Sequence, residues 1–239
     1  MSDIQREKAR ARRRGIVVVI ALLAVLAIFG VVFKGYWDER VRSAYDQSQD
    51  VYTPEPKKQP KVALWLGDSS VQGAGASDTA LRMSSLVSQR FGWYEINLGL
   101  GGSGYRAGNP NLVDQIDSLK RYKPNYIFVS AGRNDGWSED VRASVYTFYQ
   151  DLRELFPKAR LIVIAPLTTQ IPETPNPQSE GLGQLRNSVR SAAYSANGEY
   201  LSIGDLLAGK ANLLSTDGYS INDAGYKALA DAVIKALKK

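Results

Sequence analysis

The chain has 239 residues, which is enough for one or two domains. It contains no cysteine, which excludes disulfide bonds and thiolate metal sites, and it contains no histidine. The formal charge is +6, but residues 1–14 hold six basic and two acidic side chains and so carry +4 of it. Since the rest of the chain carries only +2, the high isoelectric point belongs mostly to the N-terminal tail and does not indicate nucleic-acid binding.

The N-terminal segment has the pattern of a membrane anchor. Residues 15–33 are 19 residues without a charge, mostly Ile, Val, Leu and Ala. As a helix this segment spans roughly 28 Å, close to the thickness of the hydrocarbon core. The basic cluster precedes the span, and Tyr36 and Trp37 follow it at the interfacial level, so the positive-inside rule places the N-terminus in the cytoplasm. A cleaved signal peptide is the alternative, although the apolar run is long for one and no small-x-small cleavage site follows it.

A spacer follows the expected membrane helix. Residues 34–60 are polar and charged, and they end in alternating prolines, which favour a stiff, extended chain. We therefore expect four segments: a basic cytoplasmic tail at 1–14, a transmembrane helix at 15–33, a stalk at 34–60, and a folded extracytoplasmic domain at 61–239.

The folded domain alternates strand-like and helix-like patterns. Short apolar runs, typical of strands buried on both faces of a sheet, predict strands at 61–67, 94–98, 126–130, 161–165 and 199–203. Apolar residues at helical spacing predict helices at 81–91, 112–122, from about 138 to before Pro157, at about 178–195, and at the C-terminal end, where Tyr226, Leu229, Ala230, Val233 and Leu237 point inward. Alternating strands and helices with short links indicate an α/β domain with a mostly parallel sheet and helices on both faces.

Small and polar residues follow the first three strands and precede the last helix. These segments are Gly67-Asp68-Ser69, a glycine-rich stretch at 99–104, Gly132-Arg133-Asn134-Asp135, and a loop that contains Asp217 and Ser220. In a parallel α/β sheet such segments converge on one edge. A serine there can attack a carbonyl carbon, while backbone N–H groups and an asparagine amide hold the oxyanion. Taken alone, a serine after a strand is more often a turn or cap residue than a nucleophile.

These four segments, in this order, resemble the SGNH, or GDSL, hydrolase family over the whole of 61–239. The resemblance implies a flavodoxin-like three-layer α/β/α sandwich with five parallel strands. It also implies that Ser69 is the nucleophile and that the Ser69 N–H, the Gly102 N–H and the Asn134 side chain form the oxyanion hole. The last motif of the family is an aspartate, two residues, and the catalytic histidine. Asp217 matches the aspartate, whereas Ser220 stands at the usual histidine position.

The absent histidine bears directly on catalysis. A base must take the proton of the serine hydroxyl and return it to the leaving group. Removing such a base costs on the order of 10⁶ in turnover, while binding and an oxyanion hole retain roughly 10³–10⁴ over water. Asp217 is the substitute base that the sequence offers, directly or through a water, provided that its pKa is raised. Ser220 is interpreted as a helix cap, since Ser220 to Asp223 fit a capping box.

Three functions remain open at this point. The first is a membrane-anchored extracytoplasmic hydrolase of acyl or acetyl esters of glycans or lipids, with weak activity. The second is a non-catalytic or disabled protein that binds such a ligand, and the third is an acyl transferase to a cell-surface polysaccharide. The nucleophile and oxyanion residues fit all three, and only the missing base favours the second.

No cofactor or metal is expected. The stretch at 99–104 matches G-x-G-x-x-G, but it follows the second strand, opens no helix and lacks the acidic partner of a dinucleotide site. Asp114 and Asp117 are interpreted as a solvated helix face. Trp93, Trp137 and Tyr105 line either a sugar-binding cleft or the core.

Overall fold

The computed structural model describes residues 60–169 and 177–238. The expected cytoplasmic tail, the membrane span and nearly all of the stalk lie outside these residues. Within the described ranges, no helix has the length and apolar character needed to cross a membrane.

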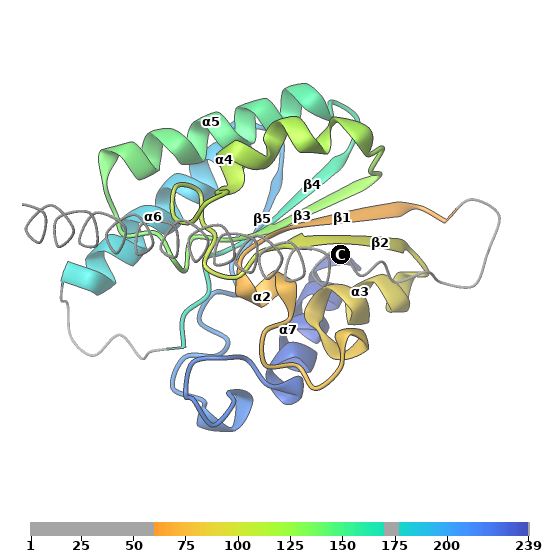
Figure 1. Cartoon of the computed structure of the whole chain (residues 1–239), viewed down its shortest axis with the longest axis vertical. Coiled ribbons are helices and arrows are strands. Elements are labelled where there is room, and N and C mark those ends of the chain that lie inside the picture. The colour runs from red at the N-terminus through yellow and green to blue at the C-terminus, as the bar shows by residue number, and fades with distance from the viewer. Residues whose placement is uncertain (1–59, 170–176, 239) are drawn as a thin grey trace, which may run out of the picture. The chain divides into compact units, whose positions relative to one another are not determined.

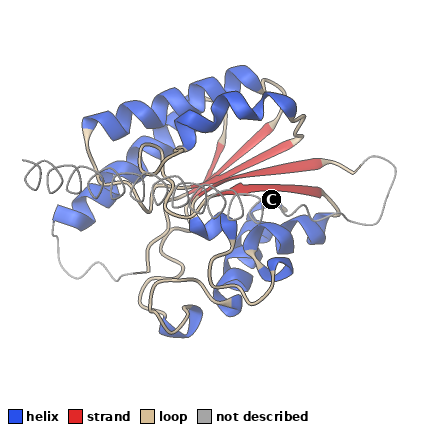
Figure 2. Cartoon of the chain, viewed as in Figure 1, coloured by secondary structure: helices blue, strands red, loops and turns tan. Residues whose placement is uncertain are grey.

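Five parallel strands form one sheet in the order β2-β1-β3-β4-β5 (Figures 1 and 2). The strands are β1 (Val62–Gly67), β2 (Tyr94–Gly99), β3 (Tyr126–Ser130), β4 (Arg160–Ile164) and β5 (Glu199–Leu201). This order is that of a flavodoxin-like sheet, in which the chain reverses its direction of travel across the sheet at β1 and β3. The predicted five-stranded parallel sheet is confirmed. In sheets of this kind ligands generally bind at the carboxyl ends of the strands where the order reverses, which here are β1 and β3.

Helices cover both faces of the sheet (Figure 1). On one face lie α4 (Leu112–Gln115), α5 (Glu139–Leu155) and α6 (Pro177–Ser195), and on the other lie α2 (Ser69–Gln72), α3 (Met83–Phe91) and α7 (Asp223–Leu237). Three 3₁₀ turns, η1 (Thr79–Leu81), η2 (Ile116–Arg121) and η3 (Ala211–Leu213), complete the elements of the described residues. The domain is therefore an α/β/α sandwich.

Alternation along the strands builds one core on each face of the sheet. Leu64 and Leu66 of β1 point to the face under α5, where Phe148 is fully buried. Trp65 points to the opposite face, where its ring stacks on Phe128 of β3 at 4.0 Å between centroids. Because both faces are covered, the central strands β1, β3 and β4 are apolar at nearly every position, which is why they could be recognised in the sequence.

The structure corrects the expected elements in three places. The helix expected at 112–122 is divided into α4 and η2, and this tighter continuation still buries both Leu112 and Leu119. Leu81 belongs to η1 rather than to α3, and it is 37% exposed because the turn capped by Asp78 directs it outward. β5 ends at Leu201, two residues before the predicted end.

Candidate active site

Ser69 lies where the chain leaves the sheet. β1 ends at Gly67, whose φ of +150° favours glycine, and a Cβ there would collide with the carbonyl oxygen of Ser130. Asp68 then caps α2, because its Oδ1 accepts the Ser70 N–H at 2.8 Å. Ser69 is therefore the first residue of a one-turn helix, and it is partly exposed.

Asp68 fixes this turn through its side chain. Its side chain is 2% exposed, and Oδ1 also accepts the Ser70 hydroxyl at 2.7 Å. Burial raises the pKa of Asp68, while the bonds from Ser70 and the positive charge of Arg133 oppose that shift. The carboxylate is thus occupied in holding the turn.

The glycine-rich loop after β2 runs beside Ser69. The Leu100 N–H donates to the Gly67 carbonyl at 2.9 Å, which ties the start of this loop to the end of β1. A Cβ at Gly101 would lie 4.0 Å from the Ser69 Cβ, so the two segments approach closely. Gly102 follows with a φ of +79°, which a side chain would strain. Its backbone therefore lies at the same edge of the sheet as Ser69.

Asn134 follows β3 and contacts the loop after β2. Its Nδ2 donates one hydrogen to the Ser103 carbonyl at 2.8 Å. The amide has a second Nδ2 hydrogen, which this bond does not use. Next to it, the Asp135 carboxylate accepts the backbone N–H groups of residues 105–107 at 2.8, 3.0 and 2.9 Å. The two loops are therefore tied together. Sequence reasoning missed Asp135, although a loop rich in glycine needs acceptors for its N–H groups.

Asp217 and Ser220 form a closed turn before α7. Oδ1 of Asp217 accepts the N–H groups of Tyr219 and Ser220, each at 2.8 Å, and Oδ2 accepts the Ser220 hydroxyl at 2.6 Å. The Ser220 hydroxyl and then these N–H groups hold the pKa of Asp217 below its ordinary value. Among the described residues, no hydrogen bond joins Asp217 to Ser69.

The interpretation of Ser220 as the cap of the last helix is wrong. The N-cap of α7 is Asn222, whose side chain accepts the Gly225 N–H at 3.0 Å. Ser220 lies two residues before the cap, and its hydroxyl is directed to Asp217. The side chain at the usual histidine position therefore contacts the carboxylate that a catalytic histidine would contact.

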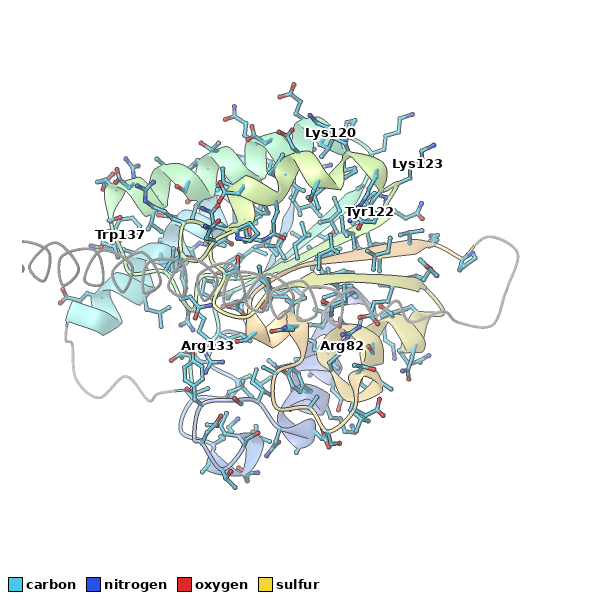
Figure 3. All side chains as sticks on the ribbon, in the orientation of Figure 1. Arg82, Lys120, Tyr122, Lys123, Arg133 and Trp137 are labelled. Atoms are coloured by element: carbon cyan, nitrogen blue, oxygen red, sulfur yellow. The ribbon has the colours of Figure 1, made fainter. Side chains whose placement is uncertain are left out.

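Arg133 connects the loop after β3 with the loop before α7 (Figure 3). Its Nη2 donates to the Tyr219 carbonyl at 2.7 Å, and its guanidinium lies 3.8 Å from the centroid of the Tyr219 ring. Its charge also favours the ionised forms of Asp68 and Asp217. Arg133 thus contacts a backbone carbonyl and an aromatic face.

A cleft of about 620 Å³ is lined by the loop after β3, the segment after β4, α6 and Tyr219, and Ser69, Gly102 and Asn134 are not among its lining residues. Arg133 and Tyr219 form part of its wall, and Trp137 from the loop after β3 forms another part. Thr168 and Gln184 contribute polar groups from the segment after β4 and from α6. The cleft therefore combines aromatic faces with hydrogen-bonding groups, as small-molecule sites commonly do.

Two of the three aromatic residues proposed for a sugar cleft lie elsewhere. Trp93 is 7% exposed and stacks on Phe91 and Tyr126, while Tyr105 is fully buried with its hydroxyl 2.6 Å from that of Tyr149. Both belong to the core, and only Trp137 lines the cleft. Within the described residues, no three Asp or Glu side chains gather as a metal site would require.

A three-layer α/β sandwich that carries a serine, a glycine-rich turn and an asparagine amide at one sheet edge has the architecture of the SGNH-type esterases. The family model described as GDSL-like lipase/acylhydrolase matches residues 65–228, and the chain belongs to that family. No curated protein sequence was found to match the chain.

Several solved structures share the fold. One is an acetylxylan esterase, Axe2 from Geobacillus stearothermophilus, with 15% identity and a TM-score of 0.61 over 77% of this chain and 97% of the esterase. A lipase/acylhydrolase from Enterococcus faecalis matches with 18% identity and a TM-score of 0.56 over 74% of this chain and 95% of its own. A carbohydrate esterase of family 2 from Corynascus thermopiles matches with 14% identity and a TM-score of 0.59 over 77% and 67%. At these identities the matches show a common fold.

Proposed function

We propose that this protein is a membrane-anchored, extracytoplasmic hydrolase of short acyl esters on glycans, and that it turns over slowly because it has no general-base imidazole. The observation that carries this proposal is the 2.6 Å bond from the Ser220 hydroxyl to Asp217, at the position where the family places its histidine. The segment at 15–33 supplies the anchor in this proposal, and the stalk separates it from the domain.

Ser69 performs the attack. Its hydroxyl oxygen bonds to the acyl carbon, and the carbonyl oxygen becomes an oxyanion held by the N–H groups of Ser69 and Gly102 and by the second Nδ2 hydrogen of Asn134. The alcohol leaves with a proton and the acyl-enzyme remains. Water then attacks the acyl carbon, releases the carboxylic acid and restores Ser69.

The slow step is removal of the Ser69 proton. Asp217 is a poor base, because its lowered pKa weakens its hold on a proton and its oxygens already accept three hydrogen bonds. The Asp68 carboxylate is buried and bonded to Ser70. The proton therefore goes to water, so the oxyanion donors and substrate binding supply the acceleration.

The cleft favours a glycan ester over a long-chain lipid. Trp137 offers an aromatic face, and Arg133 and Gln184 offer groups that pair with hydroxyls. A long acyl chain would need a continuous apolar groove, whereas this wall is interrupted by polar and charged side chains. The acetylxylan esterase among the structures of similar fold supports the same substrate class.

Acetate release by the full-length chain in detergent tests the proposal. We expect slow release from acetylated xylo-oligosaccharides and p-nitrophenyl acetate, loss of that release in Ser69→Ala, and little hydrolysis of p-nitrophenyl palmitate. Equal rates of acetate release by the parent chain and by Ser69→Ala would contradict the proposed hydrolase function. If the acetylated oligosaccharide still bound under those conditions, the non-catalytic binding function would replace it.

A further inference from the structure

The helix that carries Ser69 is too short to be stable by itself. α2 has four residues, so it forms a single turn, and an isolated turn of helix is unstable in water. Its last carbonyl groups have no partner within the helix. The position of Ser69 therefore depends on what the rest of the domain donates to those carbonyls.

One donor is Asn97 of β2. Its side chain is fully buried, and Nδ2 donates to the Val71 carbonyl at 2.7 Å and to the Ser84 hydroxyl at 2.8 Å. Its Oδ1 accepts the Gly99 N–H at 2.8 Å, which fixes the amide in this orientation. Asn97 thus joins the end of β2, the first turn of α3 and the C-terminal end of α2.

A buried ion pair lies behind Asn97. Arg82 and Glu95 are 2% and 0% exposed, and Nη2 of Arg82 lies 3.3 Å from Oε1 of Glu95, which is also 3.4 Å from Nδ2 of Asn97. Arg82 reaches α2 itself, since Nη1 donates to the Gln72 carbonyl at 3.5 Å (Figure 3). A buried ion pair is a weak source of stability, since apolar side chains of similar volume often serve as well. Because the pair lies beside α2, it can also orient Asn97 and contact the end of α2.

A second contact comes from Tyr226 of α7, which reaches the first residue of α2 and the segment just after the helix. Its side chain is fully buried, and its single hydroxyl hydrogen is shared between the Ala74 carbonyl at 2.9 Å and the Ser69 carbonyl at 3.3 Å. Burial raises the pKa of Tyr226, so the hydroxyl keeps its proton and remains a donor. This contact reaches the carbonyl of the nucleophile's own residue.

We propose that Asn97 and Tyr226 are positioning residues that hold α2 from two sides and so set the place of Ser69, with the Arg82–Glu95 pair holding Asn97. This inference extends the proposed function, because a position of Ser69 has a catalytic consequence only if Ser69 attacks. Neither side chain bonds to the Ser69 hydroxyl, so both act through the backbone of α2.

The test compares Tyr226→Phe with Tyr149→Phe. Each removes one hydroxyl from a fully buried tyrosine, but Tyr149 bonds to Tyr105 in the core on the other face of the sheet. Activity is measured in full-length chain carrying Ser220→His, which supplies a base. We expect Tyr226→Phe to lower kcat at least about tenfold with KM within about twofold, and Tyr149→Phe to change neither by more than about twofold. Asn97→Leu should act like Tyr226→Phe.

Hydrogen exchange supplies a second readout that needs no activity. The N–H groups of Gly73 and Ala74 bond to the Ser69 carbonyl and so report on α2. We expect their exchange to accelerate at least about tenfold in Tyr226→Phe and in Asn97→Leu, and not in Tyr149→Phe. Equal exchange in all variants would overturn the inference. If Ser220→His showed no hydrolysis, the proposed function would fail, while exchange would still decide the role of Asn97 and Tyr226.

Discussion

The hydroxyl of Ser220 donates to Oδ2 of Asp217 at 2.6 Å. In a serine hydrolase triad the acid orients an imidazole, which in turn faces the nucleophile. Here Asp217 accepts a comparable contact, but its partner is a serine hydroxyl, which is shorter than an imidazole and is not a base at neutral pH. The pair therefore has the contact that the acid makes in such a triad, but it lacks the base that would face the nucleophile.

The bond between these residues controls the protonation of Asp217. We expect Ser220→Ala to raise the pKa of Asp217 toward its ordinary value of 3.8, because the Ser220 hydroxyl is the largest cause of the lowered pKa. The pKa is lower in the folded state, so the stabilisation is present above the unfolded value and is lost as the pH falls through the folded value. Ser220→Ala should reduce this acid dependence. A carboxyl-carbon NMR titration measures the shift.

Ser77→Ala is the matched control for that titration. The Ser77 hydroxyl donates to Oδ2 of Asp223 at 2.6 Å and is the largest cause of the lowered pKa of that carboxyl. The control should move the pKa of Asp223 and leave that of Asp217 in place. A Ser220→Ala protein with an unchanged Asp217 titration would contradict the assigned cause.

Gly67 is required by the geometry at the end of β1. We expect Gly67→Ala to lower the free energy of unfolding by about 3 kcal/mol or more, because the Cβ would meet the Ser130 carbonyl and φ is +150°. Gly183→Ala is the control, since Gly183 lies in α6 with open space around it. This variant should raise the free energy of unfolding by about 0.5–1 kcal/mol. Urea unfolding of both variants measures the difference. Similar stabilities would show that the turn can relax.

Much of this fold could be predicted because its signals are local. β3 was predicted at its observed bounds, and Ser138 caps α5 where the apolar spacing begins. The five-stranded parallel sheet followed from the family resemblance and the alternation of elements. α2 was missed because four residues carry no periodic pattern, and its helical state depends on contacts from Asn97 and Tyr226 that are remote in sequence.

The sequence predicted which residues belong to the candidate site better than it predicted the contacts between them. Motif order placed Ser69 after the first strand and Asn134 after the third, and the structure shows that these two strands are neighbours. The role of Ser220 was wrongly predicted because the segment from Ser220 to Asp223 fits a capping box. Whether Ser220 or Asn222 caps α7 depends on where the preceding turn closes, and the sequence does not specify this. Arg133 and Tyr219 are far apart in sequence, so no local pattern pointed to their contact.

The orientation of the anchor is a prediction from charge alone. Because six basic residues precede the uncharged span at 15–33, we expect the domain to lie outside the cytoplasm. Protease added to intact cells should release a soluble fragment that begins within 38–60. A domain that is cut only after the membrane is breached would show the opposite orientation.

Restoring the missing base is the most direct test of the site. We expect Ser220→His to raise ester hydrolysis at least ~10²-fold, the lower range of what a positioned general base supplies. Asp217 already accepts from the side chain at this position, and Gly75 beside Ser220 has no side chain to obstruct a ring. The change leaves the cap of α7 intact, since that cap is Asn222.

The gain must depend on Ser69 and on the position of the new ring. Ser220→His combined with Ser69→Ala should return to the background rate, and Ser191→His, on the exposed surface of α6, should give no gain. Full activity of the parent chain would mean that another base already serves Ser69. A folded Ser220→His protein without gain on any short-chain ester, while still binding the acetylated oligosaccharide, would leave ligand binding as the function of this cleft.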